Sequence, residues 1–208
     1  MRLVFDQLSG AFAVSDMQRA FLWAVRLLAQ FAREPLSKDL SIAIDRSFSL
    51  RDTINDGLDQ VRALADGVLF EFGPSRQQDL ALRGQIVRWQ PQLRMIFVTR
   101  IALWKYRAQL PGFELPKPIT GAQEEFDESL AMMLDGVADQ MEGRTPVTGK
   151  DFEHSADRLS QTIQACCLEK PEEPLGSHLA TFISLSRKIQ TLTISLDKEV
   201  TERQSWPA

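Results

Sequence analysis

The sequence contains few of the residues that enzymes use for chemistry. It has only two histidines, His154 and His178, and two adjacent cysteines, Cys166 and Cys167. The histidines fit no metal-ligand spacing such as HExxH, and neighbouring cysteines match neither CxxC nor an unstrained disulfide. No GxSxG segment marks a nucleophile, and the scattered glycines form no phosphate-binding loop. We therefore expect no catalytic residues, no metal site and no cofactor.

Long hydrophobic runs are also missing. A membrane-spanning helix needs about 20 apolar residues, and the nearest candidate, residues 20–32, is interrupted by Arg26. The opening residues, MRLVFDQLSGAF, lack the apolar run and cleavage pattern of a signal peptide. Unpaired cysteines are typical of a reducing compartment. The sequence thus predicts a soluble chain that carries no membrane span.

Apolar residues recur at spacings of three and four along most of the chain, which is the period of one helical face. Three such stripes are Val14, Met17, Phe21, Ala24, Leu28 and Phe31, which form a coiled-coil-like seam; Leu50, Ile54, Leu58, Val61, Leu64, Val68 and Phe72; and Leu179, Phe182, Ser186, Ile189, Thr193, Leu196 and Val200. Leu40, Ile42 and Ile44 alternate with polar residues as in a strand, but a lone strand would have no partner, so we read a helix there too. The predicted fold class is all-α, an elongated antiparallel bundle that forms a single domain over residues 1–208. The six expected helices are 1–33 (with a possible joint at Ser9-Gly10), about 38–72, 76–110, 120–142, 150–169 and 177–203.

The ends of these helices follow from turn and capping residues. Gly73-Pro74 should stop the second helix, and Ser75 can cap the third. Thr120 to Gln123 match a capping box for the fourth helix. Thr148 and Ser177 should open the fifth and sixth.

The third helix, about 76–110, is the longest and contains Pro91. Proline removes one backbone hydrogen bond, so we expect a kink or break between Val87 and Pro91. Seven basic residues and one acid lie between Arg76 and Arg107, a net charge of +6 in a chain whose total is −4, which leaves −10 for the remainder. A pI near 5.3 argues against a general nucleic-acid binder. A local basic patch stays open, but ion pairs with the acidic helix 120–142 are the favoured reading.

Large aromatic residues stand among these bases. Trp89 and Trp104 lie on the apolar stripe, which favours core packing over stacking on nucleic-acid bases. A sharper hypothesis is an aromatic ligand between helices, beside Trp104, with its carboxylate held by a row of arginines, namely Arg94, Arg100 and Arg107.

Four segments carry a resemblance to a known family. They are LRDTI (50–54), VLFEFGPSRQQDLALR (68–83), WQPQLR (89–94) and RIALWKYRAQLPGFELP (100–116). Together they resemble the soluble region of the fusaric-acid-resistance (FUSC) family of bacterial membrane proteins. The resemblance implies an inner-membrane exporter related to aromatic-acid efflux proteins, and it carries over no functional residues.

Members of that family have bundles of membrane-spanning helices, which this sequence lacks. The resemblance therefore implies a cytoplasmic domain excised from a larger protein, in which transport itself cannot reside. Basic residues near the start suit a cytoplasmic segment that follows a span; they are Arg2, Arg19, Arg26, Arg33 and Lys38.

Two classes of function then compete. In the first, the chain is an assembly or regulatory domain at the cytoplasmic face of the inner membrane. Its partners would be the membrane-embedded part of the same protein and possible further copies of itself, with no nucleic acid and no metal. In the second, it is a free-standing helical module that binds an aromatic acid or a protein. An enzyme ranks third, because no acid, base and nucleophile come together.

Overall fold

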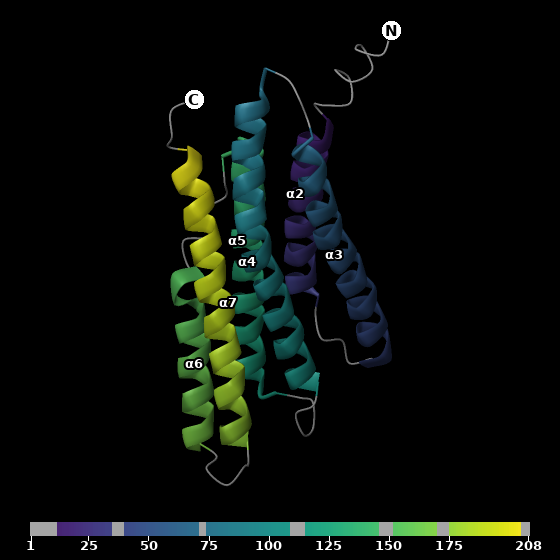
Figure 1. The fold of residues 1–208 in the computed structure, drawn as a ribbon. Coiled ribbons are helices and arrows are strands. Elements are labelled where there is room, and N and C mark those ends of the chain that lie inside the picture. Colours follow the sequence, from purple (N-terminus) through teal and green to yellow (C-terminus); the bar gives the residue numbers. More distant parts are fainter. Residues whose placement is uncertain are drawn as a thin grey trace. The chain divides into compact units, whose positions relative to one another are not determined.

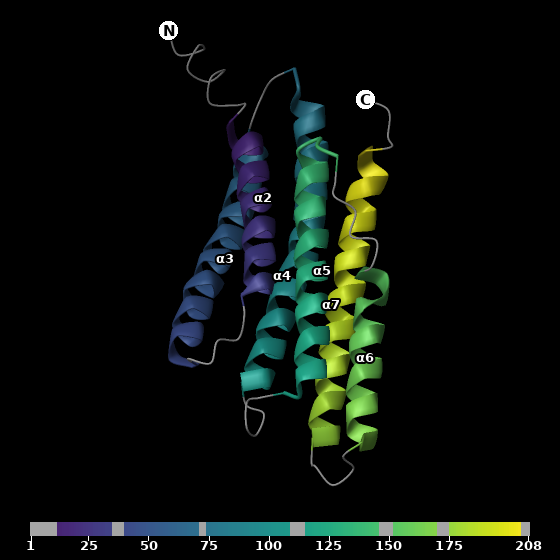
Figure 2. The same cartoon turned by 180° about the vertical axis from the view of Figure 1, so that it is seen from behind.

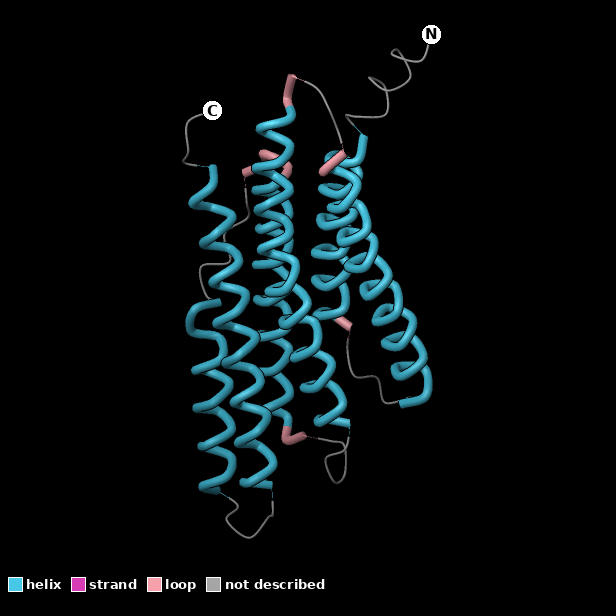
Figure 3. Tube along the Cα trace, viewed as in Figure 1, coloured by secondary structure: helices cyan, strands magenta, loops and turns pink. Residues whose placement is uncertain are grey.

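The computed structural model describes residues 12–34, 40–70, 74–108, 115–145, 152–169 and 175–204. Throughout these ranges it contains six α-helices and no strand (Figure 3), which confirms the predicted all-α helical bundle. The helices are α2 (Phe12–Arg33), α3 (Leu40–Val68), α4 (Arg76–Ala108), α5 (Lys117–Met141), α6 (Phe152–Glu169) and α7 (Leu175–Gln204).

The chain divides into two compact units. Unit 1 comprises Met1–Leu27 and Leu36–Arg94, and unit 2 comprises Leu28–Pro35 and Met95–Ala208. In unit 1, α2, α3 and the first part of α4 alternate in direction (Figure 1). In unit 2, the helices α5, α6 and α7 contact one another and also alternate in direction, as the view from behind shows (Figure 2). The single-domain assignment stays a prediction.

The core of unit 1 follows from the apolar period of α2 and α3. The seam predicted for the first helix is buried along its whole length. It consists of Val14, Met17, Phe21, Ala24, Leu28 and Phe31. The last two of these residues belong to unit 2. On α3, Ile54, Leu58 and Val61 are buried as the stripe predicted. The predicted burial of these helix faces is therefore confirmed.

The second helix is helical where a helix was predicted, but it ends earlier than expected. α3 starts at Leu40, which confirms the helix predicted for Leu40, Ile42 and Ile44. It ends at Val68, before the predicted stop at Gly73-Pro74, and Gly73 is outside the described residues. The amide of Phe70 donates to the carbonyl oxygen of Gly67 at 3.0 Å, a tight turn that ends the helix.

α4 begins directly after Ser75, as predicted, and runs without interruption to Ala108. The break considered at Pro91 is therefore not present. A proline costs one backbone hydrogen bond, and a helix whose residues on both sides are buried in cores can tolerate that loss. The kink predicted near Pro91 would change the direction of α4 where it passes from one unit into the other. It stays a prediction.

The predicted start of α5 is wrong. The helix begins at Lys117, three residues before the supposed capping box, with Pro116 as its N-cap and Pro118 in its first turn. Proline is well suited to the first turn of a helix because its φ is already helical and no amide hydrogen bond is lost. Thr120 lies inside the helix, where its hydroxyl donates to the carbonyl oxygen of Leu115 at 3.3 Å.

The core of unit 2 is built from the stripes of α5, α6 and α7. Phe126 of α5 packs against Phe152 of α6, with ring centroids 5.9 Å apart. Every member of the predicted α7 stripe is buried, from Leu179 to Val200. Gln190 of α7 donates to the carbonyl oxygen of Glu153 at 2.7 Å, which fixes α7 against the start of α6. α7 begins at Leu175, so the prediction that Ser177 opens it is wrong by two residues, whereas Thr148 is outside the described residues.

Candidate functional site

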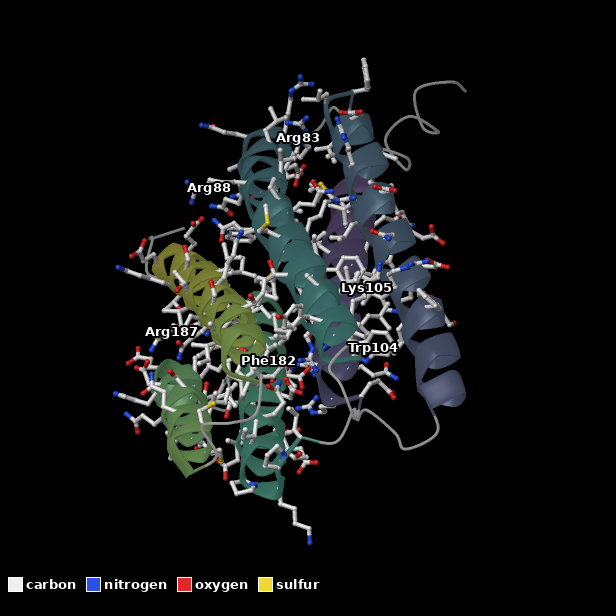
Figure 4. The ribbon with its side chains drawn as sticks, turned by 90° about the horizontal axis from the view of Figure 1, so that it is seen from below. Arg83, Arg88, Trp104, Lys105, Phe182 and Arg187 are labelled. Carbon is white, nitrogen blue, oxygen red and sulfur yellow. The ribbon has the colours of Figure 1, made fainter. Side chains whose placement is uncertain are left out.

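Two basic residues of α4 in unit 1, Arg83 and Arg94, contact α3. Arg83, which projects from the first part of α4 (Figure 4), donates from Nε to the carbonyl oxygen of Ala65 at 2.6 Å. Nη2 of Arg94 lies 2.6 Å from Oδ1 of Asp59. The last pair is largely exposed, so we expect it to contribute less than about 1 kcal/mol to stability. These contacts fix the register of α4 on α3.

Unit 2 contains a buried ion pair. Arg100 of α4 is only 4% exposed, and its Nη1 lies 2.6 Å from Oδ1 of Asp127 on α5. Nη2 of Arg100 donates to the carbonyl oxygen of Ala32 at 2.9 Å, which brings the end of α2 into the same cluster. Gln123 donates to the same carboxylate oxygen at 2.7 Å. One arginine thus connects three helices.

Two atoms of this cluster have no hydrogen-bond partner among the described residues. They are the donor Nε of Arg100 and the acceptor Oε1 of Gln123, and both are buried. Their side chains meet at the carboxylate of Asp127. A polar group that both accepts and donates would compensate the cost of burying these two atoms.

The acidic face of α5 has a second partner that the sequence did not predict. Arg33, at the end of α2, donates to both carboxylate oxygens of Glu128, at 3.1 and 3.2 Å, and to Asp135 at 2.8 Å. The hydrogen bonds that Arg33 donates to Glu128 and to Asp135 raise the pKa of Arg33 above its ordinary value, although partial burial lowers it. The predicted pairing between the Arg-rich helix and the acidic helix is confirmed for Arg100. The pairing of Arg33 was not predicted, because periodicity identifies a face but not the neighbour that covers it.

The residues proposed to bind an aromatic acid belong to different units, and two of them already have partners. Arg94 belongs to unit 1 and pairs with Asp59, whereas Arg100 belongs to unit 2 and pairs with Asp127. Trp104 is buried on the last turns of α4, beside the exposed Lys105 (Figure 4). Arg107 lies in α4, but its side chain is outside the described part of the structure. An incoming carboxylate would have to compete with Asp127 for Arg100.

The described residues hold no cluster of three or more His, Cys, Asp or Glu side chains that could bind a metal ion. Within the same ranges, none of the helices has the length and apolar character needed to cross a membrane. His154 is exposed, and the side chain of His178 is outside the described part. Cys166 and Cys167 are free thiols of intermediate exposure, so neither is fully in the core. These residues give no starting point for a reaction mechanism.

Asp197 on α7 is expected to make the free energy of unfolding depend on pH. Burial raises its pKa above the ordinary value of 3.8, although a hydrogen bond from Gln140 at 3.0 Å acts in the opposite direction. The folded state therefore holds this proton more tightly than the unfolded state, and stability is lost as the pH rises from 3.8 through the raised pKa. Replacing Asp197 by asparagine keeps the acceptor and removes the charge.

We expect Asp197→Asn to raise the free energy of unfolding at pH 7, with no gain below pH 3.8. Urea unfolding at pH 3.5 and pH 7 measures both values. Asp157→Asn on α6, which changes an exposed carboxylate, is the matched control. An equal gain for Asp197→Asn at both pH values would contradict the assignment.

Comparisons of this chain with protein families, with curated proteins and with solved structures found no match. Its function is therefore inferred from its own residues and from the resemblance that residues 50–116 carry.

Proposed function

We propose that this chain is a non-catalytic assembly or regulatory domain of an exporter that resembles the fusaric-acid-resistance family, at the cytoplasmic face of the inner membrane. The resemblance is concentrated on α3 and α4. Residues 50–54 lie in α3, and residues 89–94 and 100–108 lie in α4. These segments form helix-packing surfaces and interhelical ion pairs, as a structural domain requires.

The observation that carries the proposal is that α4 is apolar on two opposite sides. One side, which includes Trp89 and Leu93, is fully buried. The opposite side exposes apolar side chains within each unit: Val87 in unit 1 by 40% of its surface, and Met95 and Val98 in unit 2 by 45% and 52%. Exposed apolar side chains that lie about one turn apart on a helix, such as Met95 and Val98, mark interaction surfaces. This supports a domain that is completed by a larger assembly.

The binding-module alternative has less support. The charge of its key base, Arg100, is already balanced by Asp127. Nη2 of Arg100 already donates to the carbonyl oxygen of Ala32. Trp104, the proposed aromatic contact, is buried in the bundle. Both residues serve packing between helices, which is the role expected in an assembly domain.

The test is a complementation experiment in bacteria that carry the parent gene. We expect that gene to encode membrane spans in the same reading frame, and its deletion to sensitise the cells to fusaric acid. The full-length protein should restore growth, whereas a version without residues 12–204 should reach the membrane and fail to restore it. Restored growth with residues 1–208 alone, or a reading frame without spans, would refute the proposal.

A further inference from the structure

The last turn of α6 carries two consecutive cysteines, Cys166 and Cys167, which are the only cysteines of the chain. Both are free thiols, and both residues are partly accessible to solvent. Leu159 and Ile163, at the preceding positions of the same helical face as Cys166, are buried. A buried cysteine is explained by packing, because it behaves as a small apolar residue. Neither of these cysteines is buried, so packing does not explain the pair.

The helix keeps the two sulfur atoms from bonding to each other. Successive residues of an α-helix are rotated by about 100° around its axis, so their side chains diverge. A disulfide needs Cβ atoms about 3.5–4.5 Å apart and a sulfur–sulfur bond of about 2.05 Å. Neighbouring helical side chains meet those limits only with strain. The pair therefore remains two thiols as long as the end of α6 is helical.

One bridging ion relaxes this limit. Two metal–sulfur bonds of about 2.3 Å each hold the sulfur atoms up to about 4.6 Å apart. Diverging side chains span that distance more easily than the length of a disulfide bond. An ion between the two sulfur atoms is therefore compatible with an intact helix.

The number of ligands selects the kind of ion. Among the residues that the structure describes, no cluster of three or more His, Cys, Asp or Glu could hold a metal, so no third ligand of these kinds joins the pair. Soft thiolates select Cu(I), zinc and iron–sulfur clusters. Zinc takes at least three protein ligands and iron–sulfur clusters take four. Cu(I) is the member of this group that two sulfur atoms can satisfy.

The position fits a reactive thiol less well than a metal ligand. Reactive cysteines lie at helix N-termini or beside basic groups, which stabilise the thiolate. Cys166 and Cys167 lie at the C-terminal end of α6, where the helix dipole is negative. A bound cation offsets this disadvantage, because it displaces the thiol proton and supplies positive charge.

We propose that Cys166 and Cys167 form a two-ligand site for a soft, thiophilic ion of the Cu(I) class. Binding replaces each S–H bond by a bond between sulfur and the ion, leaves a bis-thiolate complex and releases both thiol protons. This inference is independent of the proposed function, since it uses only residues of α6.

The experiment titrates the reduced 208-residue chain with Cu(I) under nitrogen, in competition with the coloured Cu(I) chelator bicinchoninate. We expect one Cu(I) to be bound per chain, which is read as a loss of chelator absorbance. The same chain should take up no Zn(II) from a zinc-binding dye, because two thiolates are too few ligands for zinc.

Three variants assign the binding to the pair. Cys166→Ser and Cys167→Ser should each weaken Cu(I) binding at least about 100-fold, because one sulfur ligand is left. Met133→Leu removes a different, partly exposed sulfur atom on α5 and should leave Cu(I) binding unchanged. Circular dichroism melting checks that each variant remains folded.

Several outcomes would overturn the inference. They are no uptake of Cu(I), a single serine variant that binds Cu(I) as the original does, or uptake of Zn(II) that the serine variants abolish. One Cu(I) for two chains, with dimers in light scattering, would also overturn it, because the ion would then join cysteines of two copies. None of these results decides the complementation test of the proposed function.

Discussion

Replacing Asp127 by alanine is expected to lower the free energy of unfolding by about 3–5 kcal/mol. The change leaves Arg100, which is 4% exposed, as a buried charge without its carboxylate partner. Gln123 loses its acceptor in the same step. An uncompensated buried charge costs far more than the ion pair itself contributes, so the loss exceeds what the single contact suggests.

Urea unfolding followed by circular dichroism measures this loss. Glu124→Ala, which removes an exposed carboxylate three residues away on α5, should change the free energy of unfolding by less than about 0.5 kcal/mol. The double variant Arg100→Met and Asp127→Leu should recover most of the loss, because it replaces the pair with apolar groups of similar size. A loss below about 1 kcal/mol for Asp127→Ala would show that the pair is accessible to water.

Truncating Trp89 to alanine is the second large effect, with an expected loss of about 3–5 kcal/mol. Its side chain is fully buried in unit 1 and lies against Phe21, with ring centroids 6.3 Å apart. Removing the indole takes away the largest buried side chain and leaves a cavity that the neighbouring helices cannot fill completely.

The matched control is Val87→Ala, two residues earlier on the same helix. Val87 is 40% exposed, and alanine has the higher helix propensity, so its replacement should be nearly neutral. Urea unfolding of both variants tests the two-sided description of α4 directly. Similar losses for the two variants would contradict it, because they would place Val87 in the core as well.

Helical periodicity explains what could be predicted from the sequence. The stripes of α2 and α7 were predicted residue by residue, since burial of one face imposes spacings of three and four that are visible without a structure. The start of α5 was missed because Thr120 and Gln123 match a capping box, although Pro118 in the first turn was the better signal.

Contacts between helices were harder to predict than the helices themselves. The acids on α5 predicted a basic partner, but two helices supply it: Arg100 from α4 and Arg33 from α2. A stripe gives the orientation of a helix and not the identity of its neighbour. The exposed apolar side chains of α4, Val87, Met95 and Val98, were not predicted for a related reason, because the buried stripe already accounted for the large aromatic residues.

The continuity of α4 has a consequence for how the protein melts. Residues 76–94 of this helix belong to one core and residues 95–108 to the other. If either core opens first on heating, the remaining part of α4 acquires a loose terminus whose backbone hydrogen bonds begin to fray. Loss of order in one half would thereby weaken the other, and thermal denaturation would spread along the shared helix as one cooperative event.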